Sequence, residues 1–372
     1  MRSNEMKAHP NIRQSIYQHI YENKITSRQN IATQLGISLP TVTANLTQLT
    51  DMGLIDYVGE FESSGGRKAN MIGLVDKARY AVGVDVTREY YSIVLVDLNL
   101  EIMDSRSFRI PYADRPDYYK TLTRNIQAVL SQNNIPEDSF LGAGISLPAL
   151  INTPDHVVYY SEKVGIAADF YARFSEHAAF PFEIFNDANS AGLAEAWTEP
   201  SSSSIVYLSL SNSVGGAILF NRSLLVGDYF RSGEFGHVNI VPNGRKCYCG
   251  KKGCLDTYCS AKQFTQFTNG SLKEFFTQLE NGNDGYRAVF SSYLEYLAIA
   301  VNNLSMCFDC DIVIGGNVAV YLERYLDELK TLVNDLSPYE TTAEHIRICR
   351  FKTEPSAAGA ALYFIQEFIQ KV

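Results

Sequence analysis

One histidine and three cysteines cluster between residues 234 and 256, and they constrain the fold more than any other feature. His237, Cys247, Cys249 and Cys254 stand at His-x9-Cys-x-Cys-x4-Cys spacing, with turn-forming glycines between them. One imidazole and three thiolates fill a tetrahedral zinc shell and leave no position for an activated water, so we predict a structural zinc site. The alternative is that these four residues are unrelated members of cysteine-rich loops.

The distribution of cysteines favours metal binding over disulfides. The chain has seven cysteines, an odd number, and four of them lie between residues 247 and 259. Zinc anchoring would hold the nearby Glu234 carboxylate still and aim it into a pocket. A redox sensor that uses Cys259, Cys307 and Cys310 is a weaker alternative, because Cys307 and Cys310 fall at a predicted helix-to-strand junction, where buried free thiols are more usual.

Length, hydropathy and charge narrow the class of protein. The 372 residues suffice for two or three domains. No apolar run approaches the roughly 18 residues that span a bilayer, and the first ten residues lack the apolar core of a signal peptide, which predicts a cytoplasmic protein without a membrane partner. The formal charge is −9, yet residues 1–78 hold eight Lys or Arg against seven Asp or Glu. DNA binding by this segment therefore needs few, well-aimed contacts.

Residues 1–78 are predicted to form a winged helix-turn-helix domain. Isoleucines at four-residue spacing line a first helix over residues 11–23, Ser27 is the expected N-cap of a second helix, and Gly36 ends it before a third helix opens. The third helix turns small hydroxyl and amide side chains away from its apolar face, where they suit base edges and phosphates. The predicted DNA contacts on this helix are Ser38, Thr41, Thr43, Asn45 and Gln48.

A wing is predicted after the third helix. Residues 54–58 alternate as a strand, residues 71–74 return, and Gly65-Gly66 permits a tight tip. Arg67 and Lys68 would place two cations against a DNA backbone or minor groove. The alternative is a three-helix interaction module with a basic loop, but the helices, turn, polar face and basic wing together favour DNA binding.

The remainder of the chain has an α/β pattern, in which strand-like apolar runs alternate with helical segments. We predict two α/β lobes, residues 79–195 and 196–372, each opening with a β-hairpin, that enclose a cleft. Ligands of α/β folds tend to lie at the carboxyl ends of strands. Asn186 and Asp187 occupy such a position, where Asp187 either acts as a base towards a hydroxyl or simply caps the following helix.

Three segments resemble the signatures of the ROK family, which groups sugar-responsive repressors with sugar kinases: residues 186–188, 233–237 and 247–256. The Gly-Gly-Arg wing at residues 65–67 is similar to that of family repressors. The resemblance spans about residues 10–372 and implies an actin-like, hexokinase-like (ribonuclease H-like) two-lobed fold. It also implies that the sugar is bordered by Asn186, Asp187, Glu234, His237 and Asp256.

Some residues depart from the family pattern. Asp256 replaces the usual Glu, which withdraws the carboxylate by about 1.5 Å and predicts a different sugar preference. Asp187 stands at the position of the kinase general base. Kinases of the family cradle phosphate in an Asp-x-Gly-Gly-Thr loop, whereas Asp85 is followed here by Val, Thr, Arg and Glu. Of the nucleotide side only Gly315-Gly316 remains, and this pair can also be a plain strand-to-helix turn.

The sequence therefore predicts a DNA-binding transcriptional repressor of carbohydrate metabolism rather than an enzyme. Its effector would be a sugar or amino sugar, and its cofactor a structural Zn²⁺. A homodimer or dimer of dimers would place two heads on half-sites about 34–36 Å apart or a multiple of that distance. The alternative function is an ATP-dependent sugar kinase of the same family.

Overall fold

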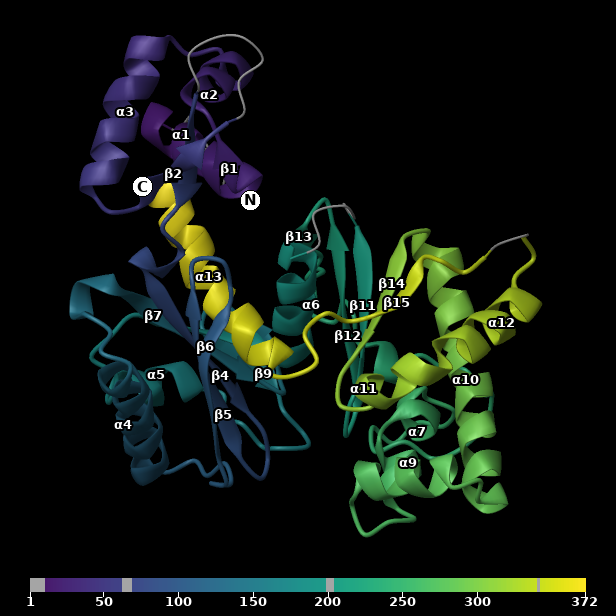
Figure 1. Cartoon of the computed structure of the whole chain (residues 1–372). Coiled ribbons are helices and arrows are strands. Elements are labelled where there is room, and N and C mark those ends of the chain that lie inside the picture. The colour runs from purple at the N-terminus through teal and green to yellow at the C-terminus, as the bar shows by residue number, and fades with distance from the viewer. Residues whose placement is uncertain (1–10, 62–68, 199–203, 340–341) are drawn as a thin grey trace.

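The computed structural model describes residues 11–61, 69–198, 204–339 and 342–372. It contains a small N-terminal head, two five-stranded sheets, and two helices between the sheets (Figure 1). This arrangement confirms the predicted α/β class with an N-terminal helix-turn-helix. In the described part of the chain, no helix has the length and apolar character needed to cross a membrane.

Local capping chemistry defines the helices of the head, as predicted. The side chain of Ser27 accepts from Asn30 N–H at the start of the second helix, and that of Ser38 accepts from Thr41 N–H at the start of the third. Gly36 ends the second helix at φ 64°, a left-handed conformation that favours glycine. Three short strands complete the head in the order β1-β3-β2. The elements are α1 (Ile12–Asn23), β1 (Ile25–Thr26), α2 (Arg28–Leu35), α3 (Leu39–Asp51), β2 (Ile55–Glu60) and β3 (Asn70–Leu74).

The strands β2 and β3 pair antiparallel, which confirms the predicted hairpin. The predicted tip cations Arg67 and Lys68 lie outside the described residues.

The first sheet has the strand order β10-β7-β4-β5-β6. Alternate residues of its central strands face opposite cores: Val82 and Val84 pack with α4, whereas Ala81 packs with the C-terminal helix α13. The elements of this region are η1 (Asp76–Ala78), β4 (Tyr80–Val86), β5 (Tyr91–Asp97), β6 (Ile102–Phe108), α4 (Pro116–Gln132), η2 (Glu137–Ser139), β7 (Phe140–Leu147), β8 (Leu150–Asn152), β9 (Val157–Tyr160), α5 (Phe170–Ser175), β10 (Phe182–Asn186) and α6 (Asp187–Thr198).

The second sheet has the order β13-β12-β11-β14-β15 and packs against the long helix α10 and its neighbours. The elements are β11 (Ile205–Leu210), β12 (Val214–Phe220), β13 (Ser223–Leu224), η3 (Phe235–His237), α7 (Asp256–Cys259), α8 (Lys262–Thr265), α9 (Leu272–Glu280), α10 (Asp284–Phe308), β14 (Asp311–Gly315), α11 (Ala319–Leu322), η4 (Glu323–Tyr325), α12 (Leu326–Leu336), β15 (Ile346–Ile348) and α13 (Pro355–Lys371).

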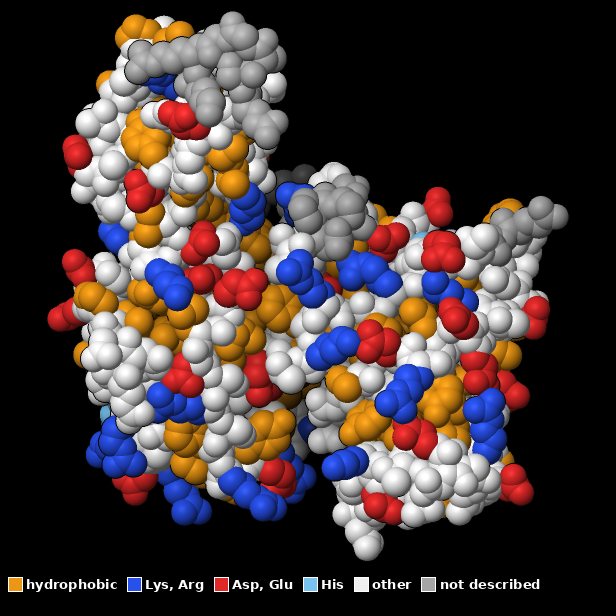
Figure 2. Space-filling model, viewed as in Figure 1, with side chains coloured by type: hydrophobic (Ala, Val, Ile, Leu, Met, Phe, Trp, Pro, Cys, Tyr) orange, Lys and Arg blue, Asp and Glu red, His pale blue; other side chains and the backbone are white. Residues whose placement is uncertain are grey.

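Helices α6 and α13 pack side by side between the two sheets (Figure 1). Although α13 follows the second sheet in sequence, it packs against β4 and β7 of the first sheet, and its end contacts α1 of the head. The space-filling view shows a groove between the two lobes, and acidic and basic side chains are mixed over this face (Figure 2). The domain limits 1–78, 79–195 and 196–372 stay predictions.

The contact between α6 and α13 depends on Gly359. A Cβ at this position would lie 1.7 Å from the backbone oxygen of Ser190 on α6. We expect Gly359→Ala to lower the free energy of unfolding by about 1–3 kcal/mol or more, because neither backbone can yield easily. Gly285→Ala on α10 is the matched control, since its Cβ would meet only Asn283 at 3.5 Å. Equal urea midpoints for the two variants would contradict this account of the packing.

Candidate functional site

Four metal-binding side chains meet where η3 and the loop before α7 approach each other. Each of the predicted ligands offers one atom, and these atoms all lie within 4.8 Å of one another: His237, Cys247, Cys249 and Cys254. Cys249 Sγ lies 3.8 Å from Cys254 Sγ, and Cys247 Sγ lies 3.9 Å from His237 Nδ1. Two sulfurs each about 2.3 Å from a tetrahedral zinc stand about 3.8 Å apart. The cluster can therefore hold a metal ion such as zinc.

Tight backbone turns bring the cysteines together. Cys247 N–H donates to Lys251 O at 2.7 Å, and Gly250 N–H donates to Cys247 O at 3.0 Å. Gly250 and Gly253 have φ values of 81° and 83°, which strain any residue with a side chain. A Cβ at Gly253 would also lie 1.9 Å from Val241 O. These glycines permit the turns on which the ligand geometry depends.

Both ring nitrogens of His237 face protein groups. Nδ1 faces the Cys247 sulfur, and Nε2 lies 3.1 Å from the hydroxyl of Tyr248. A partner on the nitrogen that does not bind metal is usual for histidine ligands, because it sets the tautomer and the ring orientation. Burial raises the pKa of the Cys247 and Cys254 thiols. A divalent cation would stabilise the thiolate forms that bind it.

Asn186 and Asp187 lie where β10 ends and α6 begins. The Asn186 side chain accepts from Asn189 N–H at 2.8 Å and donates to Ala149 O at 3.0 Å. Asn186, rather than Asp187, therefore bonds to the first turn of α6 in the manner of a cap. The Asp187 carboxylate accepts from the adjacent Ala188 N–H at 2.9 Å. Burial raises the pKa of Asp187 to about 6.

The second lobe contributes two further carboxylates, Glu234 and Asp256. Burial raises the pKa of Glu234 to about 7, and the negative charge of Asp187 contributes to the rise, so the two carboxyl groups interact across the lobes. Asp256 is 4% exposed and begins α7, two residues beyond the last zinc-type cysteine. Its Oδ1 accepts from Val214 N–H at 2.9 Å and lies 3.3 Å from Nζ of Lys163.

Sequence reasoning did not identify Lys163 or Tyr248. Lys163 belongs to the first lobe, and its Nζ reaches Asp256 and lies 3.8 Å from the ring centroid of Tyr248. Lys163 lies in a polar loop, and no sequence pattern around it predicts these contacts. Tyr248 stands between two cysteines, and only that position relates it to the metal cluster.

The turn between β4 and β5 uses its own backbone groups. Thr87 N–H donates to Tyr90 O at 2.9 Å, and Tyr90 N–H donates to the Thr87 hydroxyl at 3.2 Å. The side chains of Arg88 and Glu89 project into solvent. Burial raises the pKa of the preceding Asp85 to about 8. The amide groups of Thr87 and Tyr90, which flank the tip, are therefore engaged within the turn and not free to bind a phosphate.

The predicted DNA-contacting residues lie on both sides of the buried stripe of α3, which is formed by Val42, Leu46 and Leu49. Thr43 and Gln48 are exposed, and Thr41 and Asn45 are half-buried. Ser38 caps the helix and is also exposed. Two arginines that the sequence reasoning missed contact these residues, because Arg28 donates to Thr43 and Arg13 donates to Gln48, each at 3.3 Å.

The three other cysteines considered for redox sensing do not share one environment. Cys259 is buried and Cys310 is half-buried, but Cys307 is exposed. The expectation that Cys307 is a buried thiol is therefore wrong. Cys307 lies in the last turn of α10, on its solvent-facing side. The spacing between Cys307 and Cys310 does not indicate which side of the helix Cys307 occupies.

Comparison with known proteins identifies the fold family. A sequence model described as the ROK family matches residues 81–367. The chain belongs to the ROK family. A second model, described as winged helix-turn-helix DNA-binding, matches residues 11–56, within the segment predicted as the head.

Relatives within this ROK grouping include transcriptional regulators. The xylose repressor of Bacillus subtilis is 28% identical over 310 residues, which cover 81% of this chain and 80% of the repressor. The DNA-binding transcriptional dual regulator NagC of Escherichia coli is 25% identical over 267 residues, covering 70% of this chain and 65% of NagC. A crystal structure of a ROK family transcriptional regulator, a homolog of the E. coli MLC protein, covers 96% of both chains with a TM-score of 0.77 at 20% identity. That likeness shows the fold.

Proposed function

We propose that this protein is a sugar-responsive transcriptional repressor that binds DNA through α3 and the wing. The combination that carries the proposal is a helix-turn-helix head on a ROK body in which Lys163 interacts electrostatically with Asp187, Glu234 and Asp256. Carboxylates accept hydrogen bonds from sugar hydroxyls, and Asn186 adds an amide. The relatives named for xylose and N-acetylglucosamine make a sugar or amino sugar the first effector to test. A DNA-binding regulator belongs in the cytoplasm.

The metal we propose is a structural Zn²⁺ held by the three cysteines and His237. When bound, zinc would cross-link η3 to the start of α7 and so hold Glu234 and Asp256 at a fixed separation. His237 would bind zinc through Nδ1 and border the sugar through its other edge, next to Tyr248. Four protein ligands leave no position for a metal-activated water.

Sugar binding would reach the head through helices α6 and α13. Asp187 begins α6, Trp197 near its end contacts α1, and α13 contacts α1 directly. If the sugar prefers one arrangement of the lobes, these helices would change the tilt or separation of two heads in a homodimer or dimer of dimers. The two heads would then no longer match half-sites about 34–36 Å apart, or a multiple of that distance.

The experiment that tests this function selects a binding site from random duplex DNA and then adds sugars to the complex. We expect a gel shift that xylose, glucose or N-acetylglucosamine reverses. Gln48→Ala should weaken specific binding about 5–150-fold, since a good base contact discriminates by about 1–3 kcal/mol. Glu22→Ala, at an exposed position of α1 outside the predicted DNA contacts, is the control. A chain that selects no DNA sequence would refute the proposal.

A sugar kinase is the second candidate function, because the Asp187 carboxyl has a pKa of about 6 and can accept a proton near neutral pH. We propose that phosphoryl transfer is absent, since the β4–β5 turn bonds to itself and carries an acidic side chain. Incubation with ATP and each of the same sugars separates the two functions. Sugar-dependent release of ADP at a rate of turnovers per second would establish the kinase.

A further inference from the structure

Lys163 contacts two residues that belong to the other lobe. It lies in the segment between β9 and α5 of the first lobe, whereas Tyr248 lies in the cysteine-rich loop of the second lobe and Asp256 begins α7. Its Nζ lies 3.3 Å from Asp256 Oδ1 and 3.8 Å from the ring centroid of Tyr248. An ammonium over an aromatic face and beside a carboxylate is attracted by both groups.

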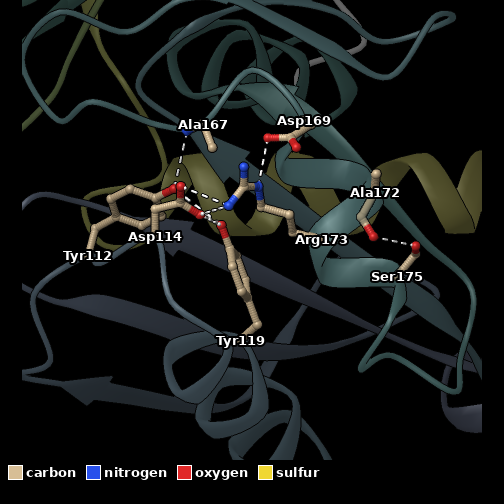
Figure 3. Close-up of polar contacts among 8 residues, drawn as sticks. All are labelled: Tyr112, Asp114, Tyr119, Ala167, Asp169, Ala172, Arg173 and Ser175. Carbon is tan, nitrogen blue, oxygen red and sulfur yellow. Dashed lines mark hydrogen bonds and ion pairs between the residues drawn. The ribbon is translucent and has the colours of Figure 1, made fainter.

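The segment that carries Lys163 is held at both ends. Gly165 N–H donates to Ser161 O at 2.9 Å, and the Ser161 hydroxyl donates to Pro148 O at 3.1 Å. On the other side, Ala167 N–H donates to the Tyr112 hydroxyl at 3.2 Å (Figure 3).

The start of α5 is held in the same way. Arg173 binds Asp169 at 2.7 Å and Asp114 at 3.1 Å (Figure 3). The position of Lys163 is therefore defined by its own lobe as well as by Asp256.

The ammonium of Lys163 contacts Asp256 and acts electrostatically on the other two carboxylates of the proposed sugar site, Asp187 and Glu234. Burial raises the pKa of both Asp187 and Glu234, and the positive charge of Lys163 opposes each rise. Its side chain is 28% exposed, so part of it remains open to a ligand. Carboxylates only accept hydrogen bonds, whereas an ammonium has three N–H donors. One of these donors points to Asp256, and among the described residues Lys163 has no second hydrogen-bond acceptor.

We propose that Lys163 is a ligand-recognition residue that donates a hydrogen bond from the first lobe to a hydroxyl oxygen of the effector. This inference rests on the proposed function and extends it to the class of ligand. A sugar hydroxyl both donates and accepts, so it can bridge Lys163 and a carboxylate at once. The neighbouring carboxylates would repel an anionic substituent. The site therefore selects an uncharged sugar over a sugar acid or sugar phosphate.

The test compares Lys163→Met with the wild-type full-length protein. The probe is whichever of xylose, glucose or N-acetylglucosamine raises the melting temperature of the wild type, with its monodeoxy and uronic acid analogues. We expect Lys163→Met to weaken binding of the parent sugar at least tenfold, while Lys163→Arg retains part of the affinity. Lys120→Met, an exposed lysine on α4, is the matched control and should leave the affinity unchanged.

The analogues distinguish a direct hydrogen bond between Lys163 and the sugar from a purely structural role of Lys163. One monodeoxy analogue should bind the wild type more weakly than the parent sugar does, yet bind Lys163→Met as well as the parent does, because the lost partner is then already absent. If every analogue loses the same factor in both proteins, or if the uronic acid binds the wild type best, the proposal is wrong. A wild type that binds none of the three sugars overturns the proposed function itself, and this inference with it.

Discussion

Cys249→Ser is expected to remove the metal from the protein and to abolish the response to sugar while leaving the DNA-binding head intact. Serine is a poor zinc ligand, and structural zinc contributes about 10–16 kcal/mol to folding in small peptides. The segment from His237 to Cys254 has two isolated bridges, Asn239 to Cys254 and Lys246 to Lys252, but no strand of its own. Without the metal, Asp256 would lose the anchor two residues before it.

The measurements are zinc content per chain, sugar affinity by calorimetry, and DNA affinity with and without sugar. Zinc should fall from about one ion per chain to none, and the sugar-dependent change in DNA affinity should vanish. Cys307→Ser makes the same atomic change at an exposed cysteine outside the cluster and should behave as wild type. A Cys249→Ser protein that lacks metal but still releases DNA on adding sugar would disprove the link between the metal and the sugar site.

The features that sequence predicted well depend on residues that are close together in the chain. The four side chains that could hold a metal ion all lie within residues 237–254, and their spacing in the sequence indicated that they can meet. The caps Ser27 and Ser38 act within three residues of themselves. The end of a strand, such as the one at Asn186, can also be predicted from the sequence, because a pair of polar residues after an apolar run indicates a strand-to-helix junction.

Contacts between distant residues were not predictable in the same way. Lys163 and Asp256 are 93 positions apart, and Trp197 and Tyr21 are 176 apart. No sequence periodicity predicts such pairs, because the residues around each partner indicate only its local secondary structure and not the distant residue that it contacts. The position of α13 against the first sheet has the same cause: its small residues Ala357 and Ala360 match Gly83 and Gly144 in space, and that match appears only after folding.

The head and the body are joined by a hydrogen-bonded chain that begins at Trp197 on α6. Trp197 Nε1 donates to the Tyr21 hydroxyl at 3.0 Å, and this hydroxyl donates to Leu98 O at 2.7 Å. Asp187 lies ten residues earlier on the same helix, or about 15 Å along its axis. Glu195, fully buried, pairs with Arg347 at 3.4 Å and accepts from Phe351 N–H, so the end of α6 cannot shift independently of the body. We therefore expect a displacement of Asp187 to reach α1 through this helix.

Tyr21→Phe is expected to uncouple sugar binding from DNA release. The change removes both hydrogen bonds of the hydroxyl and leaves the Trp197 N–H without its partner, while the ring contact at 5.6 Å remains. Coupling between two sites is typically about 5–150-fold in affinity. We expect the ratio of DNA affinities without and with sugar to lie in that range for the wild type and to approach one for Tyr21→Phe, with unchanged sugar affinity.

Tyr17→Phe is the matched control, because the Tyr17 hydroxyl is buried and has no hydrogen-bond partner among the residues that the structure describes. It removes the same atom from the same helix but no link to the body, so it should preserve the ratio. The chain has a single tryptophan, so the emission of Trp197 reports this junction directly and should change when sugar is added to the wild type. A normal ratio in Tyr21→Phe, or an emission spectrum that sugar leaves unchanged, would mean that the signal reaches the head through α13 alone.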